Sequence, residues 1–185
     1  MDGSRFLRFS TTLFALTKIA LISVVLLIAL IIFVGKPLLV NGDSMLPSFR
    51  SGEVVIVDQI SFSNQKMIRR FDVVAAKFPA DPDKTKLIKR VIGLPGEKVA
   101  VKDTHIFIDG RALTEPYQPR FGQAPYPEIA SVTLRDDEYF LAGDNRPGSS
   151  DSRLWGPVAR SDILGRVSFV IFPPSSVEYV DRLEY

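Results

Sequence analysis

The chain has 185 residues, a formal net charge of +2 from 23 Lys and Arg against 21 Asp and Glu, no cysteine and a single histidine, His105. This length accommodates one membrane segment and one domain of about 150 residues. The balanced charge, which includes no block of one sign, argues against nucleic acid as a partner. The missing cysteines exclude a Cys nucleophile, a disulfide framework and a zinc site of the His/Cys type, and a Ser-His-Asp triad would depend wholly on His105.

An apolar run of 22 residues, from Leu13 to Val34, is long enough to span a bilayer. Lys18 lies near its start and can extend its amine to the interface. Together with Arg5 and Arg8 it favours a cytoplasmic N-terminus, which places the body outside the cytoplasm. A cleavable signal peptide is the alternative, but its apolar region is usually about 7 to 15 residues and ends at a small-x-small site, whereas "FVGKPLLV" follows here.

After Gly35 the pattern changes to short apolar stretches separated by Gly, Pro and Asp, with no convincing amphipathic helix. Such stretches predict β-strands. They cover residues 53–62, 72–78, 86–94, 97–103, 105–110, 138–144 and 165–172. We expect antiparallel sheets in a mainly β, sandwich- or barrel-like body. His105 is then an ordinary hairpin residue before a turn at Asp109-Gly110, and residues 114–129, with four prolines, form a long loop or arm.

The predicted organisation is a short cytoplasmic segment at 1–12, a transmembrane anchor at 13–34 and an extracytoplasmic β-rich domain at 36–185.

Without a Cys, and with His105 assigned to a hairpin, a hydrolase would take its base from Lys, Asp or Glu. Lys89 is a candidate because "KLIKRVIGL" surrounds it with apolar residues, and strand alternation places it on one face with Leu87 and Val91. Burial disfavours the charged form of an amine and lowers its pKa, which makes the amine able to accept a proton. The alternative is that Lys89 and Arg90 lie on an edge strand and both reach solvent.

Two further stretches are rich in polar residues, and each follows an apolar segment of the chain. "NGDSMLPS", residues 41–48, places Ser44 ten positions after the end of the apolar run, and "GDNRPGSSDSRLWGP", residues 143–157, is dense in Asp, Asn, Ser and Arg. Asx and Ser turns are the usual reason for such loops. Singly, each stretch is weak evidence of a functional site.

In this order the stretches resemble the motifs of type I signal peptidases, membrane-anchored serine endopeptidases with a Ser-Lys dyad that remove signal peptides from exported preproteins. The motifs are "GDSMLPS", "RFDVVAAKFP", "IKRVIGLPGE" and "GDNRPGSSDSRLWG". The chain is similar to the compact forms with a single anchor, and the resemblance covers it from the anchor through Gly165. It implies a location at the plasma membrane, contact with membrane lipid, and no metal or cofactor.

Position by position, the resemblance implies that Ser44 is the nucleophile and Lys89 the general base. Ser149 would orient the lysine amine. Asp151 and Arg153 would form a buried polar pair, with Arg90 as a further partner and Asp144 as part of the same scaffold. The candidates for the substrate pocket are Val40, Met45, Phe49, Leu87 and Ile88; their alternative role is ordinary core packing.

Two positions depart from the family pattern. Gly42 stands where the family often has a serine that donates its hydroxyl to the oxyanion, and Ser48 stands where threonine is common. The oxyanion hole would then rest on the Ser44 N–H, with a water as a further donor.

Two other classes of protein compete with this interpretation. A self-cleaving repressor of the SOS type shares the Ser-Lys logic but would need a DNA-binding domain where this chain has an apolar span. A catalytically inactive relative that acts as a binding subunit remains the main alternative.

Overall fold

The computed structural model describes residues 3–59, 68–79, 81–83, 85–122 and 127–183. The chain divides into two compact units, Met1–Gly35 and Lys36–Tyr185. The first unit is the helix α1, Gly3–Val34, of which Phe9–Ile28 is long and apolar enough to cross a membrane by length and composition. Twenty helical residues extend about 30 Å, which matches the hydrocarbon core of a bilayer. The helix begins before residue 13, so residues 3–12 are helical and extend the predicted span at its N-terminal end.

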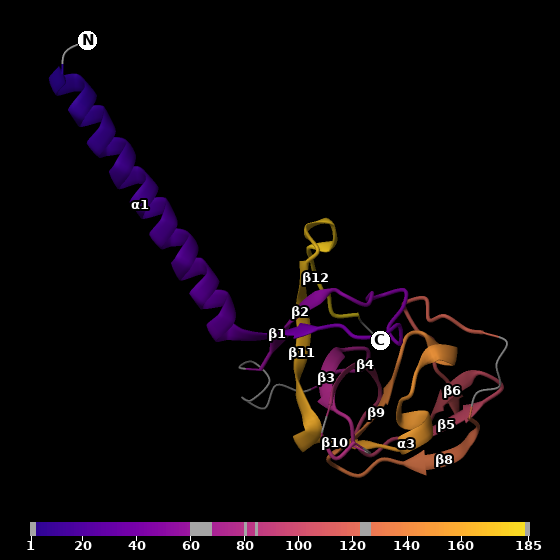
Figure 1. The fold of residues 1–185 in the computed structure, drawn as a ribbon. Helices are drawn as coiled ribbons and strands as arrows, with labels where there is room; N and C mark the ends of the chain where they lie inside the picture. The colour runs from indigo at the N-terminus through magenta and orange to yellow at the C-terminus, as the bar shows by residue number, and fades with distance from the viewer. Residues whose placement is uncertain (1–2, 60–67, 80, 84, 123–126, 184–185) are drawn as a thin grey trace. The chain divides into compact units, whose positions relative to one another are not determined.

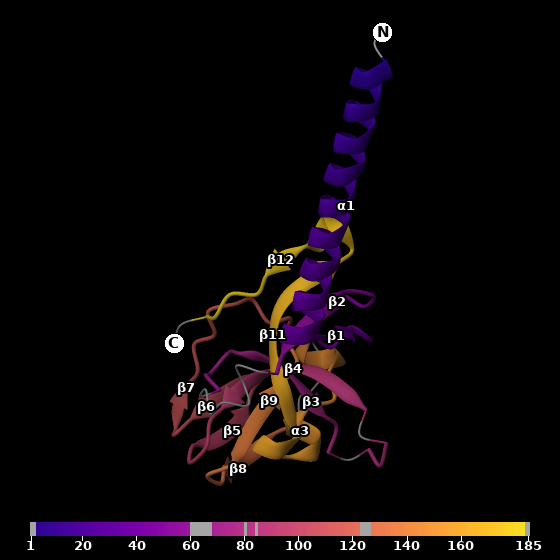
Figure 2. The same ribbon diagram turned by 90° about the vertical axis from the view of Figure 1, so that its left-hand side faces the viewer.

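The second unit is a β body with two sheets (Figures 1 and 2). In the larger sheet the strand order is β1-β2-β11-β3-β4-β9-β10, and β12 pairs with β11. Its strands are β1 (Gly35–Leu39), β2 (Val54–Asp58), β3 (Val73–Lys77), β4 (Lys86–Gly93), β9 (Glu138–Ala142), β10 (Val158–Ala159), β11 (Ile163–Phe172) and β12 (Glu178–Tyr179). From β2 to β10, and between β11 and β12, every pairing is antiparallel.

The smaller sheet has the order β7-β6-β5-β8 and gathers at one side of the body in both views (Figures 1 and 2). It contains β5 (Lys98–Lys102), β6 (His105–Ile108), β7 (Arg111–Ala112) and β8 (Ile129–Thr133). The β5–β6 turn has positive φ at Asp103 and Thr104, and the β6–β7 turn has positive φ at Asp109 and Gly110. Two successive positive φ angles are what a tight type I′ hairpin turn requires.

Three apolar clusters form the core, and β4 contributes to all of them through Ile88, Val91 and Ile92. Six consecutive residues of β4 are buried because the strand lies between β3 and β9 and is covered on both faces. A strand buried on both faces loses the alternation of apolar and polar residues that marks a half-exposed strand. Polar side chains at such positions need partners inside the body.

The short helical segments follow β9 and β10 or precede β12. They are the 3-10 turns η1 (Arg146–Gly148), η2 (Arg160–Asp162) and η3 (Pro174–Ser176), and the one-turn helix α3 (Ser152–Trp155). The segment η1–α3 leaves β9 and returns to β10, so it forms a loop at the end of β9.

The structure confirms the predicted mainly β body of antiparallel sheets, curled rather than flat, which follows one N-terminal apolar helix along the chain. All seven predicted strand segments contain a strand, although residues 60–62 of the first lie outside the described residues. The prediction missed β1, β7, β8, β10 and β12. His105 begins β6 as an exposed hairpin residue, with Nδ1 2.7 Å from the Asp103 carbonyl oxygen. Of the predicted loop 114–129, the described residues up to 128 are without helix or strand, whereas Ile129 begins β8.

Candidate active site

Ser44 lies in a tight turn between β1 and β2. The Phe49 N–H donates to the Met45 carbonyl oxygen at 2.9 Å, and the side chains of both residues are buried in one core cluster. The turn is therefore anchored by its apolar residues, while Ser44 stays at the edge of the core and is half-buried. Gly42, with φ at +82°, lets the chain enter this turn from β1.

Lys89 is held at the centre of the larger sheet, paired with Val74 of β3. It is only 3% exposed, and its Nζ lies 2.7 Å from Oγ of Ser44. Burial disfavours the ammonium form and lowers the pKa of Lys89 from 10.5 to about 8, although the carboxylates of Asp151 and Asp144 act in the opposite direction. The alternative, that Lys89 and Arg90 both reach solvent on an edge strand, is wrong, because β4 is an interior strand and both residues are buried.

The loop after β9 reaches the Ser44 turn directly. The Asn145 N–H donates to the Ser44 carbonyl oxygen at 3.0 Å, and the Asn145 side-chain amide donates to the Asp43 carbonyl oxygen at 3.0 Å. The contact is close because Gly143 has no side chain: a Cβ there would lie 2.5 Å from the Ser44 carbonyl oxygen and 2.6 Å from the Ser149 Cβ. Ser149, in the fourth motif, thus packs beside the turn that carries Ser44.

Ser149 was expected to orient the lysine amine. Its Oγ is buried and makes no hydrogen bond to any residue that the structure describes. Its place beside Gly143 and the Ser44 turn puts the hydroxyl in the region of the dyad, but it makes no hydrogen bond to Lys89. The orienting role stays a prediction.

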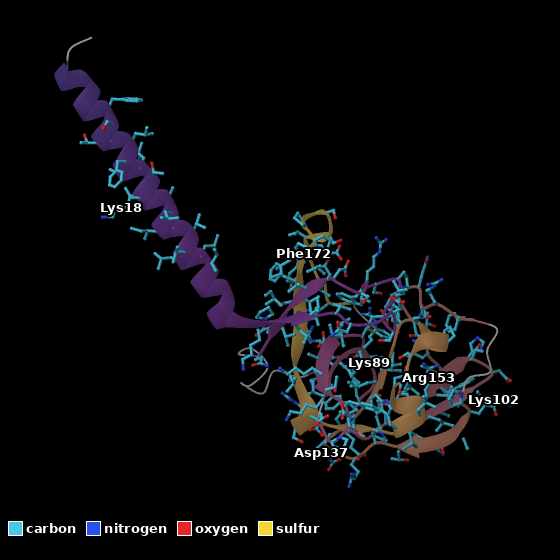
Figure 3. The ribbon with its side chains drawn as sticks, viewed as in Figure 1. Lys18, Lys89, Lys102, Asp137, Arg153 and Phe172 are labelled. Carbon is cyan, nitrogen blue, oxygen red and sulfur yellow. The ribbon has the colours of Figure 1, made fainter. Side chains whose placement is uncertain are left out.

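Asp151 and Arg153 form the expected buried pair. The Arg153 guanidinium donates to both Asp151 carboxylate oxygens, at 2.8 and 2.7 Å, and the Gly143 N–H donates to the same carboxylate at 2.9 Å. Asp151 also caps α3 by accepting from the Arg153 N–H. Figure 3 labels Lys89 and Arg153 within the β body, and the positive charge of Arg153 acts to lower the Lys89 pKa.

A second buried ion pair joins β4 to the same loop. The Arg90 guanidinium donates to both carboxylate oxygens of Asp144, at 2.9 and 2.6 Å, and to the Phe71 carbonyl oxygen at 2.9 Å. It also donates to the hydroxyl of Ser48 at 3.3 Å, so this departure from the family's threonine keeps a hydroxyl in contact with Arg90. Arg90 therefore connects the Ser44 turn, β4 and the loop after β9.

The candidate pocket residues divide into two groups. Val40, Met45, Phe49 and Ile88 are buried together in one core cluster, whereas Leu87 is half-buried. The cluster lies against the turn that carries Ser44, because Met45 and Phe49 belong to both. The packing of these residues is evident, and their contact with substrate stays a prediction.

Sequence reasoning missed one group of residues beside the site. Arg146 lies within the fourth motif but was not singled out, and its carboxylate partner, Glu115, comes from the proline-rich stretch that we treated as a connecting loop. The same loop carries three other buried charged residues, Asp144, Asp151 and Arg153, and the two carboxylates among them are paired with Arg90 and Arg153. The remaining arginine was a signal that a third carboxylate should be sought.

These contacts define a class of protein. A serine hydroxyl within hydrogen-bond distance of a desolvated lysine amine, on a rigid β scaffold, is the arrangement of serine hydrolases that use lysine instead of histidine as the base.

Comparison with known proteins identifies the family. Residues 13–172 match the family described as "Signal peptidase, peptidase S26". Signal peptidase I V of Bacillus subtilis (strain 168) is 37% identical over 140 residues, which cover 70% of this chain and 81% of the relative. Signal peptidase I of Bacillus amyloliquefaciens is 34% identical over 174 residues, which cover 90% and 89%. A crystal structure of a signal peptidase I from Enterococcus faecalis V583 is 32% identical and aligns with a TM-score of 0.48 over 56% of this chain and 98% of that one.

The chain belongs to the signal peptidase family, peptidase S26.

Proposed function

We propose that this chain is a membrane-anchored serine endopeptidase that removes signal peptides from exported preproteins, with Ser44 as nucleophile and Lys89 as general base. The observation that carries the proposal is the 2.7 Å contact between Ser44 Oγ and the Nζ of Lys89, whose pKa is lowered to about 8 by burial. A base with a pKa near the working pH is neutral often enough to accept a proton and acidic enough to return it.

The reaction follows from these two groups. Ser44 Oγ attacks the carbonyl carbon of the scissile bond while its proton passes to neutral Lys89. The resulting ammonium donates that proton to the departing amine, and the C–N bond breaks to leave an acyl-enzyme on Ser44. Lys89, neutral again, accepts a proton from water as the water attacks the ester, and it returns this proton to Ser44 Oγ when the acid product leaves. The scheme uses no metal or cofactor.

The oxyanion would be stabilised chiefly by the backbone of the Ser44 turn. Within the described part of the chain the Ser44 N–H donates no hydrogen bond, and is therefore available to a ligand. Gly42 offers no hydroxyl, and its own N–H donates to the Ser51 hydroxyl at 3.1 Å. Nothing lies within 4 Å of the position that a Gly42 Cβ would occupy, so there is room for a water as a second donor.

The anchor determines where this chemistry takes place. We assign residues 13–34 to a single membrane span, residues 1–12 to the cytoplasm and residues 36–185 to an extracytoplasmic peptidase domain. The reason is that Arg5 and Arg8 precede the span and Lys18 lies near its N-terminal end. The α1 helix continues into β1 without an intervening residue, from Val34 to Gly35. The substrate, whose signal peptide occupies the same bilayer, would present its cleavage site close to the membrane surface, and Val40, Met45, Phe49, Leu87 and Ile88 would form shallow apolar pockets for small side chains.

The test uses the full chain in detergent. Incubation with a purified preprotein, followed by N-terminal sequencing of the product, should show one cut after the signal peptide, and the Ser44→Ala variant should show none. If the wild-type chain leaves the preprotein intact but binds it, the alternative of an inactive binding subunit is correct. If Ser44→Ala cuts as well as the wild type, the dyad assignment is wrong.

A further inference from the structure

A segment of the proline-rich stretch forms a closed polar network with the loop after β9. The Glu115 carboxylate accepts hydrogen bonds from the Arg146 guanidinium and from the Tyr117 hydroxyl, and Arg146 also donates to the Tyr117 oxygen at 2.9 Å. The side chains of Arg146 and Glu115 are only 2% and 9% exposed. A buried guanidinium with a dedicated carboxylate and hydroxyl is a specific arrangement, because each partner left alone would carry a desolvation cost.

The backbones of the two segments are also paired. The Arg120 N–H donates to the Asp144 carbonyl oxygen at 2.8 Å, and the Arg146 N–H donates to the Arg120 carbonyl oxygen at 3.1 Å. These bonds form a parallel bridge between Arg120 and Asn145. Residues 115–120, which we call the arm, are therefore attached to residues 144–146 by backbone and side chains together.

Residues 144–146 in turn reach the nucleophile. The Asn145 N–H donates to the Ser44 carbonyl oxygen at 3.0 Å, and Arg146 Nε donates to the Gly143 carbonyl oxygen at 3.0 Å. A continuous chain of contacts thus runs from Glu115 through Arg146 and Asn145 to the backbone of Ser44.

Tyr117 connects the arm to the lysine side of the site as well. The Arg90 guanidinium stacks over its ring at 4.1 Å, and the Phe71 ring meets it edge to face at 5.7 Å. Burial raises the pKa of Tyr117 above its usual range, so the phenol stays protonated and remains a donor to Glu115. One side chain therefore contacts both arginines that hold the loop, Arg146 through its oxygen and Arg90 through its ring.

We propose that Glu115 and Tyr117 are positioning residues for the reaction: through Arg146 they hold the loop after β9 against the Ser44 turn and so set the orientation of Ser44 toward Lys89. This inference rests on the proposed function. Neither residue touches the reacting groups, so their effect is on geometry. Reaction rates depend steeply on such geometry, and a displacement of about 1 Å can cost about 100-fold.

The test compares Glu115→Gln and Tyr117→Phe with two matched controls in the full chain in detergent. Tyr117→Phe keeps the ring over Arg90 and removes only the oxygen. Tyr179→Phe removes the oxygen of an exposed tyrosine that also accepts from an arginine, Arg166, at 3.1 Å on the β11–β12 pair. Glu128→Gln neutralises an exposed carboxylate in the same proline-rich stretch.

We expect both arm variants to lower kcat at least about 10-fold, with KM within about twofold of the wild type, at a temperature well below their Tm. The acidic limb of the pH profile should stay in place, because the burial of Lys89 is not altered. Hydrogen exchange of a peptide covering 143–149 should become faster, because the Asn145 N–H is protected by its bond to Ser44. Both controls should retain the wild-type kcat and exchange.

Three results would overturn the inference. One is an unchanged kcat per folded molecule, with only Tm lowered, which would make the network a stabilising element alone. Another is a raised KM at constant kcat, which would place the arm in substrate binding. The third is a shift of the acidic limb to higher pH, which would mean that the arm excludes water from Lys89. An inactive wild-type chain would instead refute the proposed function, so the two failures are distinguishable.

Discussion

Raising the pH should activate cleavage through the deprotonation of Lys89. Only the neutral amine can accept the Ser44 proton, so kcat/KM should follow the fraction of Lys89 that is neutral in the free enzyme. Burial lowers the pKa of this amine from 10.5 to about 8. The experiment therefore varies the pH across about 8, the pKa of buried Lys89.

The size of the effect follows from the two pKa values. With a pKa of about 8, roughly a tenth of Lys89 is neutral at pH 7, about half at pH 8 and about nine tenths at pH 9. With a pKa of 10.5, less than about one per cent would be neutral at pH 8. The buried lysine thus gives about a fivefold rise between pH 7 and 8 and less than about a twofold rise beyond pH 8.5.

The assay is the rate of cleavage of a short signal-peptide substrate with blocked termini and no titrating side chains, measured from pH 6 to 11 with the full chain in detergent. Lys89→Arg is the control, since its guanidinium does not deprotonate in this range and the variant should be inactive throughout. A rate that keeps climbing to pH 10 or beyond would show that Lys89 is not desolvated, and the mechanism would fail at its central step.

The same shift predicts a pH dependence of stability. Between pH 8 and 10.5 the unfolded chain binds a proton at Lys89 that the folded chain does not, so the free energy of unfolding rises with pH through this window. A shift from 10.5 to about 8 corresponds to about 3 kcal/mol, present above the unfolded value and lost as the pH falls through about 8. Denaturant titrations of the wild type and Lys89→Met at pH 7 and 10 measure this difference. An equal pH response in both proteins would contradict the assignment.

Three further predictions concern single side chains. Ser44→Ala and Lys89→Ala should each abolish preprotein cleavage while circular dichroism shows an intact fold, because the two residues act as a unit, and a tenth of wild-type activity in either would remove the dyad assignment. Ser149→Ala should reduce kcat/KM less than Lys89→Ala does. It should leave Tm unchanged or higher, because the buried Ser149 hydroxyl makes no hydrogen bond in the described structure. A clear loss of Tm would show that this hydroxyl has a structural partner. Asp151→Ala should lower the free energy of unfolding by about 3 to 5 kcal/mol, because the buried Arg153 guanidinium loses its carboxylate partner. Asp136→Ala, at an exposed position, should change the free energy of unfolding little. Equal Tm values for the two variants would contradict this prediction.

The sequence predicted strands wherever the local pattern was strong. β4 and β11 are long and apolar, and the β5–β6 hairpin has alternating residues and a marked turn. The missed strands lack such signals. β1 contains Pro37, which cannot donate to a ladder, and β10 and β12 are two residues long, so their partners in the sheet define them rather than their own composition.

The candidate site was predicted only in part for a related reason. Resemblance supplied Ser44 and Lys89, and the structure shows the contact between residues 45 positions apart, which no local pattern reveals. The pairing of Asp151 with Arg153 was visible in sequence because the two lie in one loop. The pairing of Arg146 with Glu115 was not, since it spans 31 positions and one partner sits among prolines. Burial of Lys89 on an interior strand likewise depends on β9, a strand that follows the proline-rich stretch.

The place of β11 in the larger sheet has a consequence for when the enzyme becomes active. Ser44 stands beside β1 and β2, and Lys89 is on β4, next to β3; in the strand order the two halves are joined by β11, which ends at Phe172. A chain still emerging from the ribosome lacks that strand until residues 163–172 have been made. Until then the β1–β2 part and the β3–β4 part of the larger sheet share no strand ladder, and side-chain and loop contacts such as those of Arg90 with Ser48 and of Asn145 with Ser44 are what join them. We therefore expect a nonsense mutation before residue 163 to give a product without protease activity, because the strand that pairs with both β2 and β3 is then missing.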